Sequence, residues 1–261
     1  MKNKKGLVMG VANQKSIAWG IAEVLSSEGA SLALTYQGDS FKKRVEPLAK
    51  SIGSNLIFDV DVTDENSIDQ CFNELSKEWG SLDFVVHALA FSDKSELSGR
   101  FINTSRQNFL NSLDISCFSL IDISKRCSPL MNSGGAILTL SYLGSQRVTP
   151  NYNVMGVAKA ALESSVRYLA SDLGEDGIRV NAISAGPMKT LAGAAIGGAR
   201  RVFRISEQNS PLKSNPTLKS VGGTAAFLLS DYGMHVSGEV IFVDGGYHVM
   251  GMPKLDDTEK V

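Results

Sequence analysis

The chain has 261 residues, of which 20% are charged and 43% hydrophobic, and its formal net charge is −1. A chain of this length can bury a large core, and one α/β domain accommodates it at least as well as two small ones. It contains no long basic or acidic block. The composition therefore favours neither a nucleic acid nor an anionic membrane surface as a partner.

The three cysteines, Cys71, Cys117 and Cys127, are odd in number and form no CxxC pair. This pattern predicts reduced thiols and argues against a disulfide framework or a metal site. The first apolar run, 7–12, is too short for a signal peptide. The longest uncharged window, 128–146, is interrupted by proline, glycine and serine and makes a poor membrane span. We expect a soluble, cytoplasmic protein without a metal centre.

Short apolar runs alternate with amphipathic stretches along the whole chain. The expected strands are 7–11, 31–36, 56–60, 84–87, 136–140, 180–184 and 240–243, and helical patterns include 16–27, 41–51, 65–79 and 151–173. Buried strands separated by helices predict parallel pairing and right-handed crossovers. No repeat or linker divides the chain. The sequence therefore predicts one doubly wound, Rossmann-like α/β domain over residues 1–261, with about seven parallel strands and helices on both faces.

The first expected strand leads into Gly10–Gly20, GVANQKSIAWG, and then into a helix. Glycines at such a turn let backbone amides approach a pyrophosphate, and the helix N-terminus adds partial positive charge. Ser16 can cap the helix, bind a phosphate, or do both. Because Ala12 occupies the place of the second glycine of GxGxxG, this turn is a weaker nucleotide-binding signal than the usual fingerprint.

The second expected strand ends at Gln37, where dinucleotide-binding folds often place an acid that holds the ribose hydroxyls of NAD. Gln37 can bond a ribose hydroxyl without charge, and it neither repels nor clasps a 2′-phosphate. The sequence therefore leans to NADH. The neighbouring Lys42, Lys43 and Arg44 are expected on the solvated face of a helix.

Two further strand ends carry candidate cofactor contacts. Asp61 and Val62 follow the third strand and could flank an adenine ring, although Asp61 serves equally well as a turn residue. The fourth strand ends in the small residues 88–90, which allow the backbone to approach a cofactor. His87, which precedes them, is expected to be an interior histidine and not a catalytic one.

Tyr152 and Lys159 lie seven residues apart, and Tyr142 lies ten residues before Tyr152. Pro150 can open a helix, in which case Tyr152 and Lys159 share a face close to two turns apart. A nearby ammonium favours phenolate and so makes the tyrosine a better proton donor to a developing oxyanion. A tyrosine and a lysine at this spacing also occur by chance on surface helices.

A stretch rich in alanine and glycine follows the sixth strand at about 190–207. Loops of this kind are either functional lids or poorly ordered segments. The position at the carboxyl end of a strand favours a substrate-binding lid, in which Thr190 can bond a phosphate or carboxamide. The candidate apolar pocket residues are Met155, Met188, Ile196 and Phe203, and ordinary core packing explains any one of them equally well.

Four features together resemble the short-chain dehydrogenase/reductase family across nearly the whole chain: the glycine turn, Tyr152-x6-Lys159, Ala185-Gly186-Pro187 and Asp244-Gly245-Gly246. The chain departs from that family's common pattern in three places. The turn contains Ser16-Ile17-Ala18, the usual Asn-Asn-Ala-Gly is replaced by His87-Ala-Leu-Ala, and the usual serine is replaced by Thr139. Together with Tyr-x9-Tyr-x6-Lys, these departures closely resemble the bacterial NADH-dependent enoyl-acyl-carrier-protein reductases of type II fatty acid synthesis.

The resemblance implies reduction of the trans-2 double bond of enoyl-acyl-carrier-protein thioesters by NADH, in a homotetramer. It implies Tyr142, Tyr152 and Lys159 as catalytic residues. The implied cofactor-binding residues are Gly10, Ser16, Ile17, Gln37, Asp61, Val62, Leu89, Lys159 and Thr190. The implied substrate pocket consists of Ala90, Phe91, Met155, Met188, Ile196 and Phe203, with Ala90 standing where some members have glycine.

Two other functions are open to this fold. A 3-oxoacyl or other ketone reductase would carry a serine at position 139, where this chain has threonine. A non-catalytic dinucleotide-binding sensor or scaffold would not need Tyr152, Lys159 and a lid together. The apolar tail, 248–252, could pack on a neighbouring subunit.

Overall fold

The computed structural model describes residues 1–191, 193 and 198–252. Its strands form one parallel sheet in the order β3-β2-β1-β4-β5-β6-β7. This arrangement confirms the predicted fold class. The strands are β1 (Lys5–Met9), β2 (Ser31–Tyr36), β3 (Leu56–Asp59), β4 (Leu82–His87), β5 (Met131–Ser141), β6 (Arg179–Ala185) and β7 (Val240–Val243).

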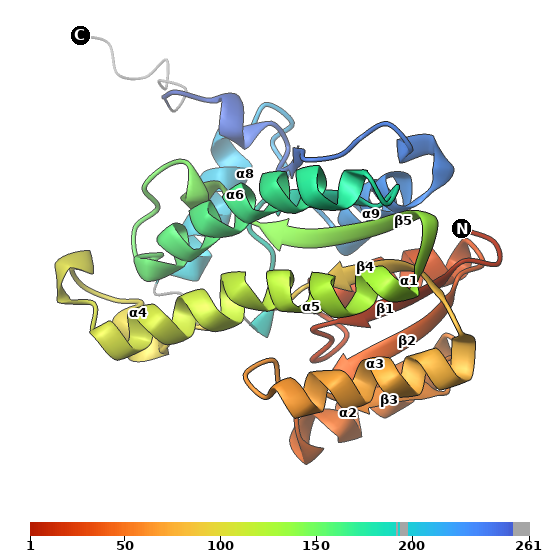
Figure 1. Ribbon diagram of the computed structural model, residues 1–261. Coiled ribbons are helices and arrows are strands. Elements are labelled where there is room, and N and C mark those ends of the chain that lie inside the picture. Colours follow the sequence, from red (N-terminus) through yellow and green to blue (C-terminus); the bar gives the residue numbers. More distant parts are fainter. Residues whose placement is uncertain (192, 194–197, 253–261) are drawn as a thin grey trace, which may run out of the picture.

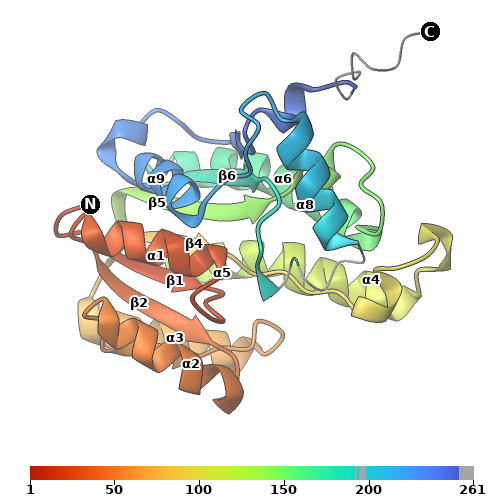
Figure 2. The same cartoon turned by 180° about the vertical axis from the view of Figure 1, so that it is seen from behind.

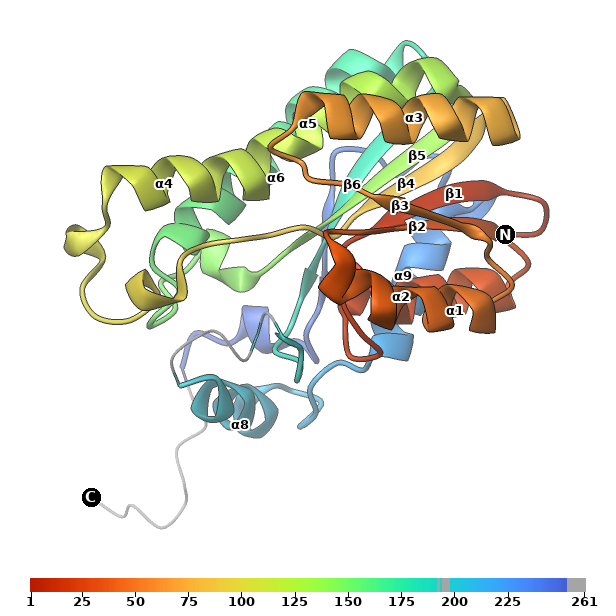
Figure 3. The same cartoon turned by 90° about the horizontal axis from the view of Figure 1, so that it is seen from below.

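Helices cover both faces of the sheet (Figures 1 and 2). Seen from below in Figure 3, one layer holds α1 (Ile17–Ser27), α2 (Asp39–Ser51) and α9 (Leu218–Leu229), and the other holds α3 (Glu65–Trp79), α5 (Ser119–Cys127) and α6 (Val154–Gly174). Two helices, α4 (Arg106–Leu113) and α8 (Ala199–Asn209), lie beyond the sheet. Helix α4 continues through a π-helical turn, η3 (Asp114–Phe118), into α5.

Each layer has its own apolar core because the central parallel strands are buried on both faces. On one side, Ile21 of α1 and Val221 of α9 pack against the strands. On the other side, Phe72 of α3 and Leu162 of α6 do so. The core thus fixes the sheet from both faces and leaves its carboxyl edge to the loops.

The strand order reverses between β1 and β4, which are neighbours in the sheet although β2 and β3 separate them in sequence. In open α/β sheets, ligands bind outside the carboxyl ends of the strands at such a switch point. The segments that follow β1, β4, β5 and β6 therefore meet at one edge, and these are the segments that carry the predicted site.

The long helix after β5 starts later than predicted. It begins at Val154 and not at Pro150, and Tyr152 precedes it in a turn closed by the bond from the Tyr152 amide to the Thr149 carbonyl. Asn151 and Asn153 have φ values of 63° and 41°. Such left-handed conformations cannot continue a right-handed helix, and asparagine is among the few residues that adopt them readily.

Candidate active site

A continuous cavity of about 2380 Å³ lies at the carboxyl edge of the sheet. It is larger than the roughly 300–1,000 Å³ of an ordinary ligand pocket, so it has room for a dinucleotide and a second molecule. Every predicted site residue that the structure describes lines this cavity. Ile196 lies outside the described residues, as does part of the predicted lid.

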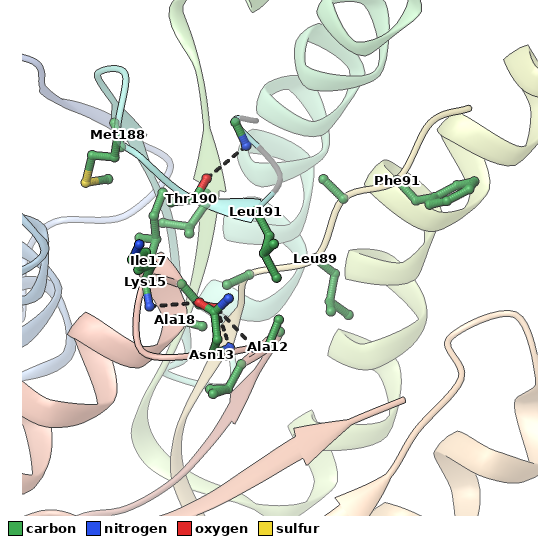
Figure 4. A pocket seen from close by; sticks show the side chains of 18 of the residues that line it. Ala12, Asn13, Lys15, Ile17, Ala18, Leu89, Phe91, Met188, Thr190 and Leu191 are labelled. Atoms are coloured by element: carbon green, nitrogen blue, oxygen red, sulfur yellow. Dashed lines mark hydrogen bonds between the residues drawn. The ribbon is translucent and has the colours of Figure 1, made fainter. Parts of the chain in front are cut away.

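The turn after β1 brings backbone close to the cavity. Gly10 has φ 95°, and a Cβ on it would lie 2.1 Å from the carbonyl oxygen of Ala88. The Ser16 hydroxyl accepts hydrogen bonds from the amides of Ala12 and Asn13 at 3.0 and 3.1 Å. Ser16 occupies the N-cap position of α1, but its side chain folds the turn and does not cap the helix. Figure 4 shows Ile17, the first residue of α1, facing the cavity beside this turn.

The end of the cavity beside β2 and β3 is polar. The Asp61 carboxylate accepts hydrogen bonds from the amide and hydroxyl of Thr63 at 2.9 and 2.7 Å. The Thr63 amide is the main reason that the pKa of Asp61 is lowered, burial opposes it, and a hydrogen bond with Gln37 adds to the lowering. Asp61 is thus both a turn residue and a wall of the cavity. Lys43 and Arg44 are solvent-exposed, as expected, but they also border this end of the cavity.

The two tyrosines meet at the other end of the cavity. Tyr142 follows β5, and its ring packs edge-on against that of Tyr152, with 4.9 Å between ring centroids. Tyr152 and Lys159 are only 7% and 5% exposed. The Lys159 ammonium donates to the carbonyl oxygen of Leu140 at 2.7 Å. Strand β5 therefore positions Tyr142 directly and orients Lys159 through its backbone.

Burial shifts the pKa of both ionisable groups at this end of the cavity. Burial raises the pKa of Tyr152, and the neighbouring Tyr142 and Glu163 raise it further. Burial disfavours the charged form and so acts against the phenolate that a nearby Lys159 was expected to favour. Burial also lowers the pKa of Lys159 to about 8, against the opposing effects of Cys117 and Glu163. Tyr152 is thus held as a neutral phenol that can donate a hydrogen bond.

His87 is fully buried, which confirms the prediction that it is an interior histidine. Its Nδ1 lies 3.0 Å from the Thr139 hydroxyl and its Nε2 lies 2.8 Å from the Ser119 hydroxyl. Burial, with Lys159 as a smaller cause, lowers the pKa of His87 to about 3, so the ring is neutral at physiological pH. Thr139, also fully buried, occupies the position of the ketone-reductase serine but hydrogen-bonds His87.

The loop after β6 also lines the cavity. Figure 4 shows Met188, Thr190 and Leu191 above the turn that carries Ile17, with Leu89 to their right. The Thr190 hydroxyl accepts a hydrogen bond from the Gly193 amide at 2.9 Å. The Lys189 ammonium lies 4.9 Å from the ring centroid of Phe203 on α8. The described part of the predicted lid thus borders the cavity from both the loop and the helix.

Sequence reasoning assigned no role to two polar residues that hold segments lining the cavity. Ser116, in the π-helical turn η3, accepts from the Phe91 amide at 2.9 Å and donates to the Phe91 carbonyl at 3.1 Å. It therefore holds the segment that carries Ala90 and Phe91. Glu163, buried on α6, binds the segment that carries Tyr142. No spacing rule marks either residue, but a carboxylate among the apolar positions of a helix is a signal that could have identified Glu163.

The comparison with protein families assigns residues 10–248 to the model described as Enoyl-(Acyl carrier protein) reductase. That match covers most of the chain. The chain belongs to the enoyl-acyl-carrier-protein reductase family.

The sequences of similar proteins align with this chain over nearly their whole lengths. Enoyl-[acyl-carrier-protein] reductase [NADH] 1 of Rhizobium meliloti is 56% identical over 98% of this chain and 94% of its own length. Enoyl-[acyl-carrier-protein] reductase [NADH] FabI of Rickettsia typhi is 51% identical over 98% of both proteins. The crystal structure of the Anaplasma phagocytophilum enoyl reductase in complex with NAD matches with a TM-score of 0.94 at 55% identity, over 98% of this chain and 96% of that one.

Proposed function

We propose that this enoyl-acyl-carrier-protein reductase reduces the trans-2 carbon–carbon double bond of enoyl thioesters with NADH, the last reductive step of fatty acid elongation. The observation that carries the proposal is the pair of phenols, Tyr142 and Tyr152, which pack edge to face at one end of a cavity large enough for a dinucleotide. The position that a ketone reductase fills with serine is Thr139, which is buried and hydrogen-bonded to His87.

The residues present fit a dinucleotide. The first amides of a helix have no acceptor within it, so the start of α1 at Ile17 offers N–H groups and partial positive charge to a pyrophosphate. The absence of a Cβ at Gly10 leaves the turn close to β4. Gln37 and the Asp61–Val62 pair would hold the adenosine part, Thr190 and Leu89 would hold the nicotinamide part, and Lys159 would hold the ribose hydroxyls beside it.

When bound, the reduced nicotinamide supplies a hydride to the β-carbon of the substrate. The electrons of the double bond then move toward the thioester carbonyl, and negative charge collects on its oxygen. Tyr152, a buried and neutral phenol, would donate a hydrogen bond to that oxygen. A donor fixed before the reaction stabilises charge that develops in the transition state without reorganising. Protonation of the α-carbon completes the reduction.

Lys159 would act through its position and charge. Its ammonium is hydrogen-bonded to the Leu140 carbonyl, and the residue lines the cavity. We infer that it bonds the ribose hydroxyls and places a positive charge near the developing oxyanion. Tyr142 would lie over the reacting carbons and, by packing on the Tyr152 ring, would keep that phenol in place.

The apolar substrate pocket would consist of Ala90, Phe91, Met155, Met188, Ile196 and Phe203, under a lid at about 190–207. An acyl carrier protein would present the thioester at this opening. The exposed α8 next to it carries Arg200, Arg201 and Arg204. These charges would favour a carrier with an acidic surface.

Assembly and location are part of the same proposal. Exposed apolar side chains lie on the outer helices, among them Leu110, Phe118, Ile121 and Val157. Apolar surface of this kind marks contacts between proteins, and we propose that it is buried in a homotetramer. Among the described residues, no helix is long and apolar enough to span a membrane. We propose a cytoplasmic enzyme, in keeping with the buried free thiols of the three cysteines.

The test is oxidation of NADH with a trans-2-enoyl thioester, measured beside a 3-oxoacyl thioester and repeated with NADPH. We expect turnover of the enoyl substrate and a preference for NADH. Turnover of the 3-oxo substrate alone would establish a ketone reductase instead. Binding of NADH without turnover of either substrate would support a sensor or scaffold.

A further inference from the structure

Glu163 is a buried carboxylate with no place in the mechanism above. It lies on α6, one turn after Lys159, and is only 5% exposed. A buried charge is costly unless it is hydrogen-bonded. Its partners therefore indicate what this carboxylate does.

Among the described residues, the carboxylate of Glu163 accepts three hydrogen bonds, all from the segment that surrounds Tyr142. Oε1 accepts from the hydroxyls of Ser141 at 2.5 Å and Ser145 at 2.6 Å. Oε2 accepts from the side-chain Nε2 of Gln146 at 3.3 Å. Ser141 directly precedes Tyr142, and Ser145 closes the short helix η5 (Leu143–Ser145) that follows it. The carboxylate thus ties both sides of Tyr142 to α6.

The same α6 turn holds Lys159, whose ammonium bonds the carbonyl oxygen of Leu140, the residue before Ser141. The Lys159 ammonium and the Glu163 carboxylate, one turn apart on α6, therefore both hydrogen-bond the segment 140–146. This arrangement ties the segment that carries Tyr142 to the helix that carries the ammonium. It also leaves the buried Lys159 with a negative neighbour.

We propose that Glu163 is a positioning residue for the reductase reaction: its carboxylate fixes the segment that carries Tyr142 and supplies the negative charge beside Lys159. This inference rests on the proposed function, because it assigns Glu163 a role in the same site. The titratable groups that raise the pKa of Lys159 are Glu163 from its own helix and Cys117 from η3. Lys159 in turn lowers the pKa of the buried His87 of β4.

Two substitutions separate geometry from charge. Glu163→Leu removes these three acceptor contacts and leaves the buried Ser141 hydroxyl and the half-buried Ser145 hydroxyl without this partner. Glu163→Gln keeps an acceptor oxygen but removes the charge. We expect kcat for the enoyl thioester to fall about a hundredfold in Glu163→Leu and about tenfold in Glu163→Gln, with the Kd for NADH changed less than about threefold. The control is Asp172→Asn, which removes an exposed charge from the same helix.

The charge has its own readout. Glu163 raises the pKa of Lys159 against the effect of burial. In Glu163→Gln the alkaline decline of kcat/KM should therefore begin at a lower pH than in the wild type. A residue with a merely structural role would lower the melting temperature but would leave kcat and the pH profile of the folded protein unchanged, and that result would overturn the proposal.

A third readout does not depend on activity. Amide hydrogen exchange across 140–147 should be about tenfold faster in Glu163→Gln than in the wild type, because the segment loses its charged anchor. Unchanged amide exchange would refute the positioning role. Absence of turnover in the wild type would instead refute the proposed function, and the exchange measurement would still test the role of Glu163. If the Glu163 variants do not fold, Ser141→Ala with Ser145→Ala removes the two shortest contacts and keeps the carboxylate. Full kcat in that double variant would also refute the proposal.

Discussion

Tyr152 keeps its proton because its phenol is buried among neighbours that disfavour phenolate. Burial is the largest cause of the raised pKa, followed by Tyr142 and then Glu163. A group that must donate a hydrogen bond to an oxyanion benefits from this state, since the proton remains on the phenol at physiological pH. The catalytic value of Tyr152 thus depends on where the phenol is held.

Tyr152→Phe should keep the ring and its packing on Tyr142 but remove the donor. We expect kcat for the enoyl thioester to fall by about 10²–10³-fold, the usual cost of losing one oxyanion donor. The Kd for NADH should be nearly unchanged. Tyr232→Phe is the matched control, because Tyr232 is 90% exposed. Full activity in Tyr152→Phe would contradict the assigned role.

The lowered pKa of Lys159 predicts that both activity and stability depend on pH. Its pKa of about 8 lies below the usual 10.5 because the ammonium is buried. As pH rises through about 8, the ammonium is lost and kcat/KM should fall. Over the window from about 8 to 10.5 the unfolded chain holds more protons at this site than the folded chain. The contribution of Lys159 to the free energy of unfolding therefore rises with pH while activity falls.

Paired pH profiles of kcat/KM and of urea unfolding for wild type would check this prediction. The decline in activity should occur in protein that is still folded. A flat kcat/KM between about pH 7 and about pH 9 would contradict it.

At the scale of elements, the turn between β1 and α1 depends on close backbone approach. Gly10→Ala would place a Cβ 2.1 Å from the Ala88 carbonyl oxygen, in a backbone conformation with φ 95°. We expect weaker NADH binding, by about tenfold or more, together with a lower melting temperature. Fluorescence titration with NADH and thermal unfolding would measure the two effects.

Gly80→Ala is the matched control for that turn. Gly80 follows α3 with φ 71°, but a Cβ there meets nothing within 4 Å. The free energy of unfolding of this variant should fall by about 1 kcal/mol, because alanine disfavours the left-handed conformation. The variant should bind NADH as tightly as the wild type does. Equal NADH affinity in Gly10→Ala and Gly80→Ala would show that close approach at Gly10 does not matter.

Much of the element pattern was predictable because buried parallel strands have a strong hydrophobic signal. The predicted bounds of β2, β7 and α3 match the structure. The bounds of β5 do not, since it runs from Met131 through a glycine pair that weakens the apolar pattern. The start of α6 was also missed. The local sequence Asn151-Tyr152-Asn153 does not indicate that both asparagines adopt positive φ. That conformation depends on tertiary contacts, such as the hydrogen bond from Asn153 Nδ2 to the Glu96 carbonyl.

The site was predictable where it follows from strand ends. Gly10, Leu89, Tyr142 and Thr190 come just after strands whose carboxyl ends share one edge, so alternation of elements already places them together. Residues that act from inside helices carry no such signal. Ser116 reaches Phe91 from a π-helical turn, and Glu163 reaches Ser141 from the buried side of α6. Both contacts depend on packing between distant segments.

At the scale of the whole molecule, a chain of 27.9 kDa leaves apolar side chains such as Leu110, Phe118 and Ile121 exposed on its outer helices. We expect light scattering to give a mass about four times that of the chain. Ile121→Glu should lower this mass, because a charge is costly in an apolar contact, while circular dichroism stays unchanged. A monomeric wild type at micromolar concentration would contradict the tetramer.

In the proposed reaction, the cavity brings together the donor of a hydride to the β-carbon and the Tyr152 phenol that would hold the thioester oxygen. The most direct measurement uses NADH carrying deuterium at the transferred C4 position and a trans-2-enoyl thioester. Mass spectrometry and NMR would then locate the label in the product. We predict one deuterium at the β-carbon of the saturated acyl chain. Deuterium on a carbon that bears a hydroxyl, or a product without label, would contradict the account.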